Sequence, residues 1–451
     1  MEQMEWQRLV TNKRLGQEHF HPQRHDDRTE FKRDYDRLIF SAPFRRMQNK
    51  TQVFPLPGSV FVHNRLTHSL EVASVGMSLG SDVAKILIRE KYPSLAGTLF
   101  EEIGQIVSTA CLAHDMGNPP FGHSGEKAIQ TFFSEGKGQF LKPLVSEELW
   151  SDITHFEGNA NAFRLLTHKF KGRREGGFVM TYATLGAIVK YPWASWYAGD
   201  KGKFGFFASE GSLYVRIAEE MGLIRRGGDD GTPQLMFARH PLVYLVEAAD
   251  DICYEIMDIE DAHKLKILTY DETSDMLLGF FDGDTRRKIL QRIKDEGLTD
   301  PNEMVAYMRA RVIGLLIKEC VDAFVRNEEA IMRGAFGQPL IKSISPRARD
   351  NYARLIEQSE VKIYKSKPVL DVELSGYKIM ATLMEQMTEA AAYPERYYSR
   401  QLLNRVSSQY DIDSPQLETR IMAVIDYISG MTDVYALDVY QKISGISLPI
   451  V

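Results

Sequence analysis

Hydrophobic residues recur three or four positions apart along most of the chain, with polar residues between them. This spacing gives a helix one face for packing and one face for water. The segments that carry it span residues 28–52, 64–91, 100–114, 124–134, 158–168, 241–263, 301–330, 346–360, 368–389 and 415–445. The pattern predicts a mainly α-helical fold.

Three stretches rich in glycine and charge interrupt the helical pattern, at residues 171–177, 198–211 and 225–231. Between the last two, the aromatic run around Phe206 and the apolar residues around Tyr214 suggest a short β-hairpin or an ordered flap. Candidate functional residues lie on both sides of these stretches. We therefore interpret them as long loops within one helical domain covering residues 1–451, with a core at about 60–265 and a C-terminal helical region at about 300–451.

Composition narrows the class of protein. The cysteines Cys111, Cys253 and Cys320 are scattered through apolar segments without metal-ligand spacing, so we expect packed free thiols in a reducing compartment. The N-terminus is too polar for a signal peptide, and no apolar run approaches the length of a membrane span. We expect a cytoplasmic protein without a membrane partner. A net charge of -6 disfavours long-range attraction to nucleic acid, so a site for a polyanion must be local.

The most informative chemistry is the adjacent pair His114 and Asp115, at the end of a predicted helix. Neighbouring side chains usually point apart on a helix. Here Gly117 and the pair Pro119 and Pro120 end the helix, and the backbone can turn so that both side chains reach one cation. Alone, such a doublet is most often a solvated surface pair.

Two other helices carry related residues. In the segment from residue 64, Arg65 and His68 share one face. The apolar stripe of that helix, from which His68 is offset, is predicted to contain Leu66, Leu70, Ala73, Met77, Ala84 and Leu87. Between His240 and Lys264 the next helix carries seven acidic residues and no Lys or Arg, and like charges one turn apart disfavour a helix.

A divalent cation would explain these helices together. If each helix is considered alone, the simpler explanations are that His68 is a core histidine with its hydrogen bonds satisfied and that the acidic helix exposes a solvated face. Imidazole and carboxylate ligands suit Mn, Fe, Co, Ni or Zn better than Ca or Mg alone. We expect a divalent metal ion, Mn²⁺ or Mg²⁺ first, with Fe, Co, Ni or Zn as alternatives.

Several motifs resemble bacterial deoxyguanosine triphosphate triphosphohydrolases, a family of the HD-domain phosphohydrolase superfamily. They occur in the expected order from about residue 30 to about residue 440, so the resemblance covers almost the whole chain. The matching segments are Lys50–Leu56, Arg65–Val72, His114–Glu126, Phe156–Ala160, Lys190–Pro192 and Asp426–Asp433. One departure is Asn161, where many relatives carry Gln, which puts the local contact in doubt. The C-terminal match carries no metal-binding or nucleophilic pattern, so packing or subunit contact is its simpler role.

The resemblance implies a ligand set of His68, His114, Asp115 and Asp250 for the metal. These ligands leave positions for water and for a phosphate oxygen. His123 and Glu126 lie three residues apart, so the carboxylate can orient the imidazole. In the family this pair supplies acid–base catalysis at the α-phosphorus. Whether His123 acts as general acid or general base is open, and loop packing is the alternative role.

Substrate selection is implied for a further set of residues. Tyr254 and Asp258 follow Asp250 by one and two turns, so they line one side of the helix. In the family the tyrosine packs on the deoxyribose and the aspartate accepts the 3′ hydroxyl. The remaining contacts implied are Gln52 and Val53 near sugar and base, and Arg65, Lys190 and Tyr191 at the phosphates. The simpler alternatives are a core aromatic for Tyr254 and a helix-end amide for Gln52.

The resemblance thus implies metal-dependent hydrolysis of dGTP, and of other dNTPs as further candidates, to deoxynucleoside and inorganic tripolyphosphate. One alternative is another HD phosphohydrolase, acting on nucleotide monophosphates, cyclic nucleotides or guanosine polyphosphates. A second is a non-catalytic nucleotide-sensing or single-strand-binding protein. Tyr254 and Asp258 disfavour the former, and the pair of His123 and Glu126 disfavours the latter. The resemblance also implies a homo-oligomer, a hexamer in the family, and leaves open an effector such as single-stranded DNA or a second nucleotide.

Overall fold

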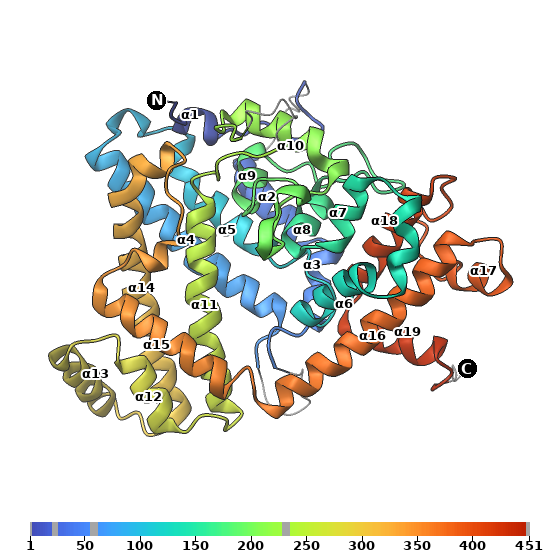
Figure 1. Ribbon diagram of the computed structural model, residues 1–451. Helices are drawn as coiled ribbons and strands as arrows, with labels where there is room; N and C mark the ends of the chain where they lie inside the picture. The colour runs from blue at the N-terminus through green and yellow to red at the C-terminus, as the bar shows by residue number, and fades with distance from the viewer. Residues whose placement is uncertain (1, 20–25, 55–61, 228–234, 448–451) are drawn as a thin grey trace.

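Helices account for nearly all the regular structure in the computed structural model, which describes residues 2–19, 26–54, 62–227 and 235–447 (Figure 1). Within these residues the only β-type pairings are isolated bridges, such as that between Trp193 and Met236, and no sheet forms. The predicted mainly α-helical fold is confirmed. No helix among the described residues is long and apolar enough to cross a membrane.

The N-terminal half of the chain supplies the helices around the candidate site. They are α1 (Trp6–Leu9), α2 (Glu30–Ile39), α3 (Ala42–Arg46), α4 (Arg65–Glu90), α5 (Ile103–Ala113), α6 (Gly122–Ser134), α7 (Glu147–Thr154), α8 (Gly158–Thr167), α9 (Tyr182–Ile188), α10 (Ala208–Met221) and α11 (Val243–Lys264). The 3-10 helices in this half span Met47–Asn49, Pro93–Leu95, Leu99–Glu102, Lys137–Leu144, Ser195–Tyr197 and Gly199–Lys201.

The rest of the chain adds helices of very different lengths. They are α12 (Tyr270–Leu278), α13 (Gly283–Asp295), α14 (Pro301–Met332), α15 (Pro346–Lys362), α16 (Lys367–Ala392), α17 (Tyr397–Leu403), α18 (Leu417–Ser429) and α19 (Asp433–Ile443), with a 3-10 helix at Leu340–Lys342. In Figure 1, α16 runs from the lower centre to the right, beside α6 and α18, which it contacts.

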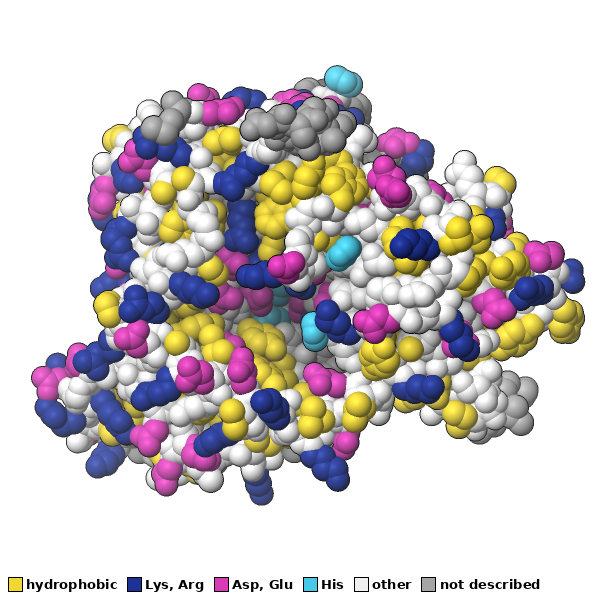
Figure 2. Space-filling view, viewed as in Figure 1, with side chains coloured by type: hydrophobic (Ala, Val, Ile, Leu, Met, Phe, Trp, Pro, Cys, Tyr) yellow, Lys and Arg dark blue, Asp and Glu magenta, His cyan; other side chains and the backbone are white. Residues whose placement is uncertain are grey.

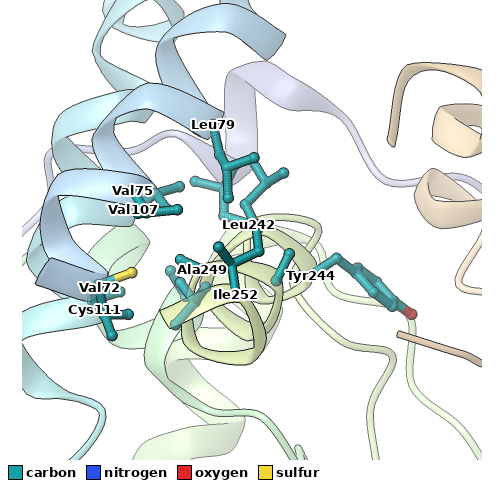
Figure 3. Packing of buried hydrophobic residues seen from close by; sticks show 14 of the residues in the cluster. Val72, Val75, Leu79, Val107, Cys111, Leu242, Tyr244, Ala249 and Ile252 are labelled. Atoms are coloured by element: carbon teal, nitrogen blue, oxygen red, sulfur yellow. The ribbon is translucent and has the colours of Figure 1, made fainter. Parts of the chain in front are cut away.

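The main hydrophobic core forms where α4 packs against α5 and α11. Figure 3 shows Val72 of α4 beside Cys111 of α5, Val75 beside Val107, and Ile252 of α11 facing the same core. Burying a side chain of this size stabilises the fold by about 1.5–3 kcal/mol. All three cysteines are buried and free, as the sequence predicts. The three helices that carry the His and Asp residues are thus fixed by one apolar core.

A second hydrophobic cluster joins α6 to the C-terminal part of the chain. Ile129 and Phe133 of α6 pack with Met380 and Leu383 of α16 and with Ile425 of α18. The C-terminal helices therefore pack directly on the helix that begins at Gly122 and bears His123. The single-domain organisation drawn from the sequence stays a prediction.

The predicted helical segments all contain helices, with two internal breaks. Segment 28–52 divides at Ser41, whose hydroxyl accepts the N–H of Phe44 and caps a new helix. Segment 415–445 divides between Ser429 and Asp433. The short helices α7, α9, α12, α13 and α17 lie outside the predicted segments. Residues 228–231 of the third predicted break, and Pro55 and Leu56 of the first motif, lie outside the described residues.

Two sequence expectations are wrong. The hairpin or flap expected around Tyr214 is helix α10, in which Tyr214, Ile217, Ala218 and Met221 are buried at helical spacing. Its aromatic neighbour Phe206 stacks on Tyr214 with ring centroids 4.5 Å apart. On α4, the predicted stripe residue Leu70 is 40% exposed, while Val72 and Leu79 are buried. Ala73, Ala84 and Leu87 of the predicted stripe are buried as expected, but the core face of α4 is centred on the side of Val72 and Leu79, because α5, α11 and α14 pack on it.

Candidate metal centre and active site

Three helices bring the predicted His and Asp residues together. His68 lies in the first turn of α4, His114 directly follows α5, and Asp250 lies in the middle of α11. The capping box of Asn64 with Thr67 fixes where α4 begins and so fixes the position of His68.

The distances within the cluster match those between ligands of one cation. Candidate ligand atoms of His68, His114 and Asp115 all lie within 4.8 Å of one another. Oδ1 of Asp250 lies 3.1 Å from Nε2 of His68 and 3.4 Å from Nε2 of His114. Ligands about 2.0–2.2 Å from a metal lie roughly 3–4 Å from each other. The four residues that the sequence singles out therefore converge.

The tautomer of His114 leaves its inner nitrogen available. Nδ1 of His114 lies 2.6 Å from the carbonyl oxygen of Cys111, so it carries the proton and donates it to that carbonyl. Nε2 of His114 is buried and has no hydrogen-bond partner among the described residues. An unpartnered buried nitrogen is costly, and a bound cation would satisfy it.

Asp115 is held by neighbours that also touch the following loop. Nη1 of Arg65 lies 2.8 Å from Oδ2 of Asp115, and the side-chain amide of Asn118 donates to Oδ1 at 2.5 Å. Gly117 permits the turn after the doublet, because a Cβ there would lie 2.1 Å from the carbonyl oxygen of Gly158. Asn161 donates to the carbonyl oxygen of Gly117 at 2.7 Å, so this residue contacts the turn that follows the doublet.

The electrostatics of the cluster favour a bound positive charge. Burial alone would lower the pKa of His114, yet the carboxylates of Asp115 and Asp250 raise it to about 9. Burial alone would raise the pKa of Asp250, yet the imidazoles of His114 and His68 hold that pKa well below its usual range. The unpartnered nitrogen and this concentration of carboxylate charge both fit a divalent cation.

A cavity of about 110 Å³ adjoins the cluster, lined by His114, Asp115, Asn118, Asn159, Ala187, Ile188, Lys190, Val243, Val246, Glu247 and Asp250. Nζ of Lys190 lies 3.2 Å from Glu247, which also pairs with Arg239 at 3.1 Å. Although burial lowers the pKa of Lys190, Glu247 raises it above the ordinary value, so the ammonium stays charged. Figure 2 shows histidine, acidic and basic side chains gathered around a hollow near the centre of this face.

His123 and Glu126 lie at the start of α6, with Nδ1 of His123 3.7 Å from Oε2 of Glu126. The imidazole is exposed, whereas Glu126 is buried and accepts the N–H of Gly158 at 2.8 Å. Burial would raise the pKa of Glu126, but His123 and Lys203 lower it below its usual value. The carboxylate is thus fixed and charged, next to an imidazole that solvent or a ligand can reach.

Tyr254 and Asp258 lie along α11 beyond Asp250, as predicted. The Tyr254 ring meets the His68 ring edge to face, with centroids 6.4 Å apart. It also stacks on Tyr364, whose hydroxyl donates to Oδ2 of Asp258 at 2.8 Å. Burial raises the pKa of Asp258 well above its usual range. Sequence reasoning misses Tyr364, which follows α15, because no local pattern links it to a helix 106 residues earlier.

The remaining predicted residues are Gln52, Val53 and Tyr191. The side-chain carbonyl of Gln52 is buried without a hydrogen-bond partner in the described structure. Val53 packs against the main core. The Tyr191 ring lies beside Trp193, and the guanidinium of Arg239 lies over it, 5.8 Å from the ring centroid. The side-chain carbonyl of Gln52 is thus an atom that a ligand could bind.

Comparisons with known proteins agree with this arrangement. Residues 65–175 match the HD domain, and residues 343–442 match the phosphohydrolase-associated domain. The chain is 38% identical to a deoxyguanosinetriphosphate triphosphohydrolase-like protein of Pseudomonas aeruginosa, over 99% of this chain and 100% of that protein. The chain belongs to the deoxyguanosinetriphosphate triphosphohydrolase family.

Other members of this family span the chain in the same way. A deoxyguanosinetriphosphate triphosphohydrolase-like protein of Synechocystis is 36% identical over 99% of this chain and 100% of its own length. The deoxyguanosinetriphosphate triphosphohydrolase of Yersinia enterocolitica is 29% identical over 92% of this chain and 93% of its own length. Three of the four residues of the cluster, His68, His114 and Asp115, lie within the HD match.

Proposed function

We propose that the chain hydrolyses deoxynucleoside triphosphates, dGTP first, to deoxynucleoside and inorganic tripolyphosphate. The observation that carries the proposal is the contact between the rings of His68 and Tyr254. His68 belongs to the candidate metal cluster, where the phosphates would bind, and the Tyr254 ring offers an apolar face on which a sugar could pack. Family membership makes the chain a hydrolase of the HD class and supports a nucleotide substrate.

The metal would be held by His68, His114, Asp115 and Asp250. When bound, a divalent cation there supplies positive charge that polarises a phosphate oxygen and increases the acidity of water. Lys190 and Arg65 would compensate the charge of the polyphosphate, since Lys190 lines the adjoining cavity and Arg65 borders Asp115.

Proton transfer falls to His123, with Glu126 as its orienting carboxylate. Hydrolysis adds water at the α-phosphorus and breaks its bond to the 5′ oxygen of the nucleoside, so that oxygen must gain a proton while the water loses one. The exposed imidazole of His123 is the group available to move a proton. Tyr254 would pack on the sugar, and Asp258, oriented by Tyr364, would accept the 3′ hydroxyl.

Product analysis tests this proposal. The protein is incubated with each of the four dNTPs and with GTP, in Mn²⁺, in Mg²⁺ and in a chelator, and the products are separated by chromatography. We expect deoxynucleoside and tripolyphosphate, with dGTP turned over and the chelator abolishing turnover. Orthophosphate as the product, or equal efficiency on GTP and dGTP, would instead favour another HD phosphohydrolase. The homo-oligomer stays a prediction from the resemblance, the cytoplasmic location stays a prediction from the sequence, and an effector nucleotide or DNA stays open.

A further inference from the structure

The segment of residues 117–124 connects α5 to α6 and carries His123. It borders the metal cluster at two points. Asn118 bonds to Asp115, and a Cβ at Gly122 would lie 2.4 Å from Nη2 of Arg65. Any displacement of this segment would therefore move His123 relative to the cluster.

The backbone of this segment is strained at Phe121, which has φ 60° and ψ 20°. This is the left-handed conformation, which residues other than glycine rarely adopt. Such a residue keeps its conformation only where the surrounding structure holds it. The contacts of Phe121 therefore show what fixes the segment.

Asp433, the first residue of α19, provides the polar contact. Its Oδ1 accepts the backbone N–H of Phe121 at 3.0 Å, and its Oδ2 accepts the backbone N–H of Thr51 at 2.7 Å. The carboxylate is buried, with a residue exposure of 7%. It thus joins the strained residue to the motif that contains Gln52, although 312 residues separate Asp433 from Phe121.

Two more contacts from the C-terminal half hold the segment. The hydroxyl of Ser124 donates to the carbonyl oxygen of Glu373 at 2.6 Å. Phe121 itself packs so closely on α16 that a Cβ at Gly376 would lie 2.5 Å from the Cβ of Phe121. Both partners lie in the part of the chain that matches the phosphohydrolase-associated domain.

Lys50 completes the connection. Its Nζ donates to the carbonyl oxygens of Asn118 at 2.5 Å and Ser429 at 3.0 Å. Lys50 and Asp433 therefore bridge the same three parts of the chain, which are the motif at residue 50, the 117–124 segment and the region where α18 ends and α19 begins. The two side chains bind backbone atoms on either side of the turn between Asn118 and Phe121.

We propose that Asp433 is a positioning residue, which holds the Phe121 amide so that His123 faces the metal-bound substrate. This inference rests on the proposed function in one respect, the role of His123. It gives the C-terminal motif at residues 426–433 a role in positioning a catalytic side chain, in addition to the packing or subunit contact expected from the sequence. In this proposal the C-terminal half of the chain acts on the reaction by positioning His123.

Asp433→Asn tests the proposal with little change in volume. An asparagine offers one carbonyl oxygen, so one of the two N–H donors must face an amide NH₂ group. We expect kcat to fall by about 10-fold to 10²-fold, since a displacement of about 1 Å can cost that much. Metal content should stay within about twofold of wild type, because the candidate ligands lie on α4, on α11 and at the end of α5, and KM should change less than kcat, because Arg65, Tyr254 and Asp258 lie outside the segment. Asp438→Asn, on the same helix in an exposed pair with Lys442, is the matched control and should leave kcat unchanged.

A double-mutant comparison separates positioning from general stability. If Asp433 acts through His123, Asp433→Asn should cost little in a His123→Ala background, whereas a structural defect would lower turnover further. Hydrogen exchange should accelerate in peptides covering residues 117–124 and not in α4 or α11. Ser124→Ala, which removes a second anchor, should give the same pattern with a smaller loss, and it serves if Asp433 variants fold poorly.

The outcomes distinguish the two proposals. Faster exchange in residues 117–124, alone or together with the peptide around Thr51 but not in α4 or α11, supports the positioning role even if the wild type is inactive on dNTPs, a result that would overturn the proposed function alone. In an active enzyme, unchanged kcat in Asp433→Asn overturns the positioning role. A loss of turnover that is fully additive with His123→Ala overturns it as well.

Discussion

The metal cluster and the 117–124 segment are neighbours in sequence but are held in place by different forces. His68, His114 and Asp250 are fixed by α4, α5 and α11, which pack through a buried apolar core. The segment that bears His123 is held by polar contacts from Asp433 and Lys50 and by the packing of Phe121 on α16, outside that core. The helices of the core thus fix the candidate metal ligands directly. The group that would transfer the proton, His123, is positioned by contacts from outside that core.

The largest loss of turnover is expected from removing one of the candidate metal ligands that the core helices hold. His114→Ala or Asp250→Ala should reduce turnover by about 10³-fold or more and also reduce bound metal, because several kcal/mol of charge stabilisation are lost. The protein should remain helical, since both side chains face the cluster and not the apolar core. Elemental analysis and circular dichroism check this.

A histidine outside the cluster supplies the control for that experiment. His155 at the end of α7 bonds to the carbonyl oxygen of Ser151, and His155→Ala should retain both metal and activity. Full metal occupancy in both His114→Ala and Asp250→Ala would remove these residues from the coordination shell.

The next largest effect on turnover distinguishes the 117–124 segment from the metal cluster. His123→Ala should lower kcat by roughly 10²-fold while metal content and substrate affinity stay close to wild type. The reason is that the imidazole is exposed and bonded to no member of the cluster in the described structure. Steady-state kinetics with equilibrium binding of a dNTP make the measurement. Unchanged turnover, or loss of metal, would contradict the assignment.

The same contrast explains what the sequence can predict. The cluster is predictable because a short motif, His114 and Asp115, reports local geometry at a helix end, and because Arg65 and His68 share a helical face. The long helices are predictable because their periodicity persists over many turns. The family resemblance supplies Asp250, whose distance in sequence hides its place in the cluster.

The parts that escape prediction depend on contacts between distant residues. Tyr364 and Asp433 reach their partners across 106 and 312 residues, and no local spacing encodes such pairs. Helix α10 escapes for another reason. Its buried residues Tyr214, Ile217 and Met221 do follow helical spacing, but the glycines and aromatics before them favour a hairpin. The face of α4 is misplaced because tertiary packing, and not local hydrophobicity, selects it.

Sugar selection should give a smaller effect and extends the comparison to the far end of α11. If Tyr254 packs on the deoxyribose, a 2′ hydroxyl must displace the ring or be buried without a partner, at about 1–3 kcal/mol. We expect dGTP to be preferred over GTP by at least about tenfold. Tyr254→Ala should narrow that ratio chiefly by admitting GTP. Asp258→Ala should weaken both substrates and reduce selection against dideoxy-GTP. The measurement is kcat/KM for the three nucleotides.

Tyr364→Phe refines this prediction, because it removes the hydrogen bond to Asp258 and keeps the stack on Tyr254. It should reproduce part of the Asp258→Ala effect and leave the dGTP to GTP ratio near that of wild type. If it altered the ratio as strongly as Tyr254→Ala does, Tyr364 and not Tyr254 would be the residue that faces the sugar.

The smallest effect concerns the packing that places the cluster. At Gly80 an added Cβ would lie 2.7 Å from Cα of Gly104, so Gly80→Ala must push α4 from α5 and should destabilise the fold by about 1–3 kcal/mol. At Gly314 in α14 an added Cβ would meet no atom within 4 Å, so Gly314→Ala should raise stability by about 0.5–1 kcal/mol through helix propensity. Urea unfolding followed by circular dichroism measures both.

Because His68 and His114 belong to the two helices that Gly80 brings together, Gly80→Ala should also weaken metal binding, whereas Gly314→Ala should not. Equal stability of the two variants would show that the close approach of α4 and α5 is not what fixes the cluster.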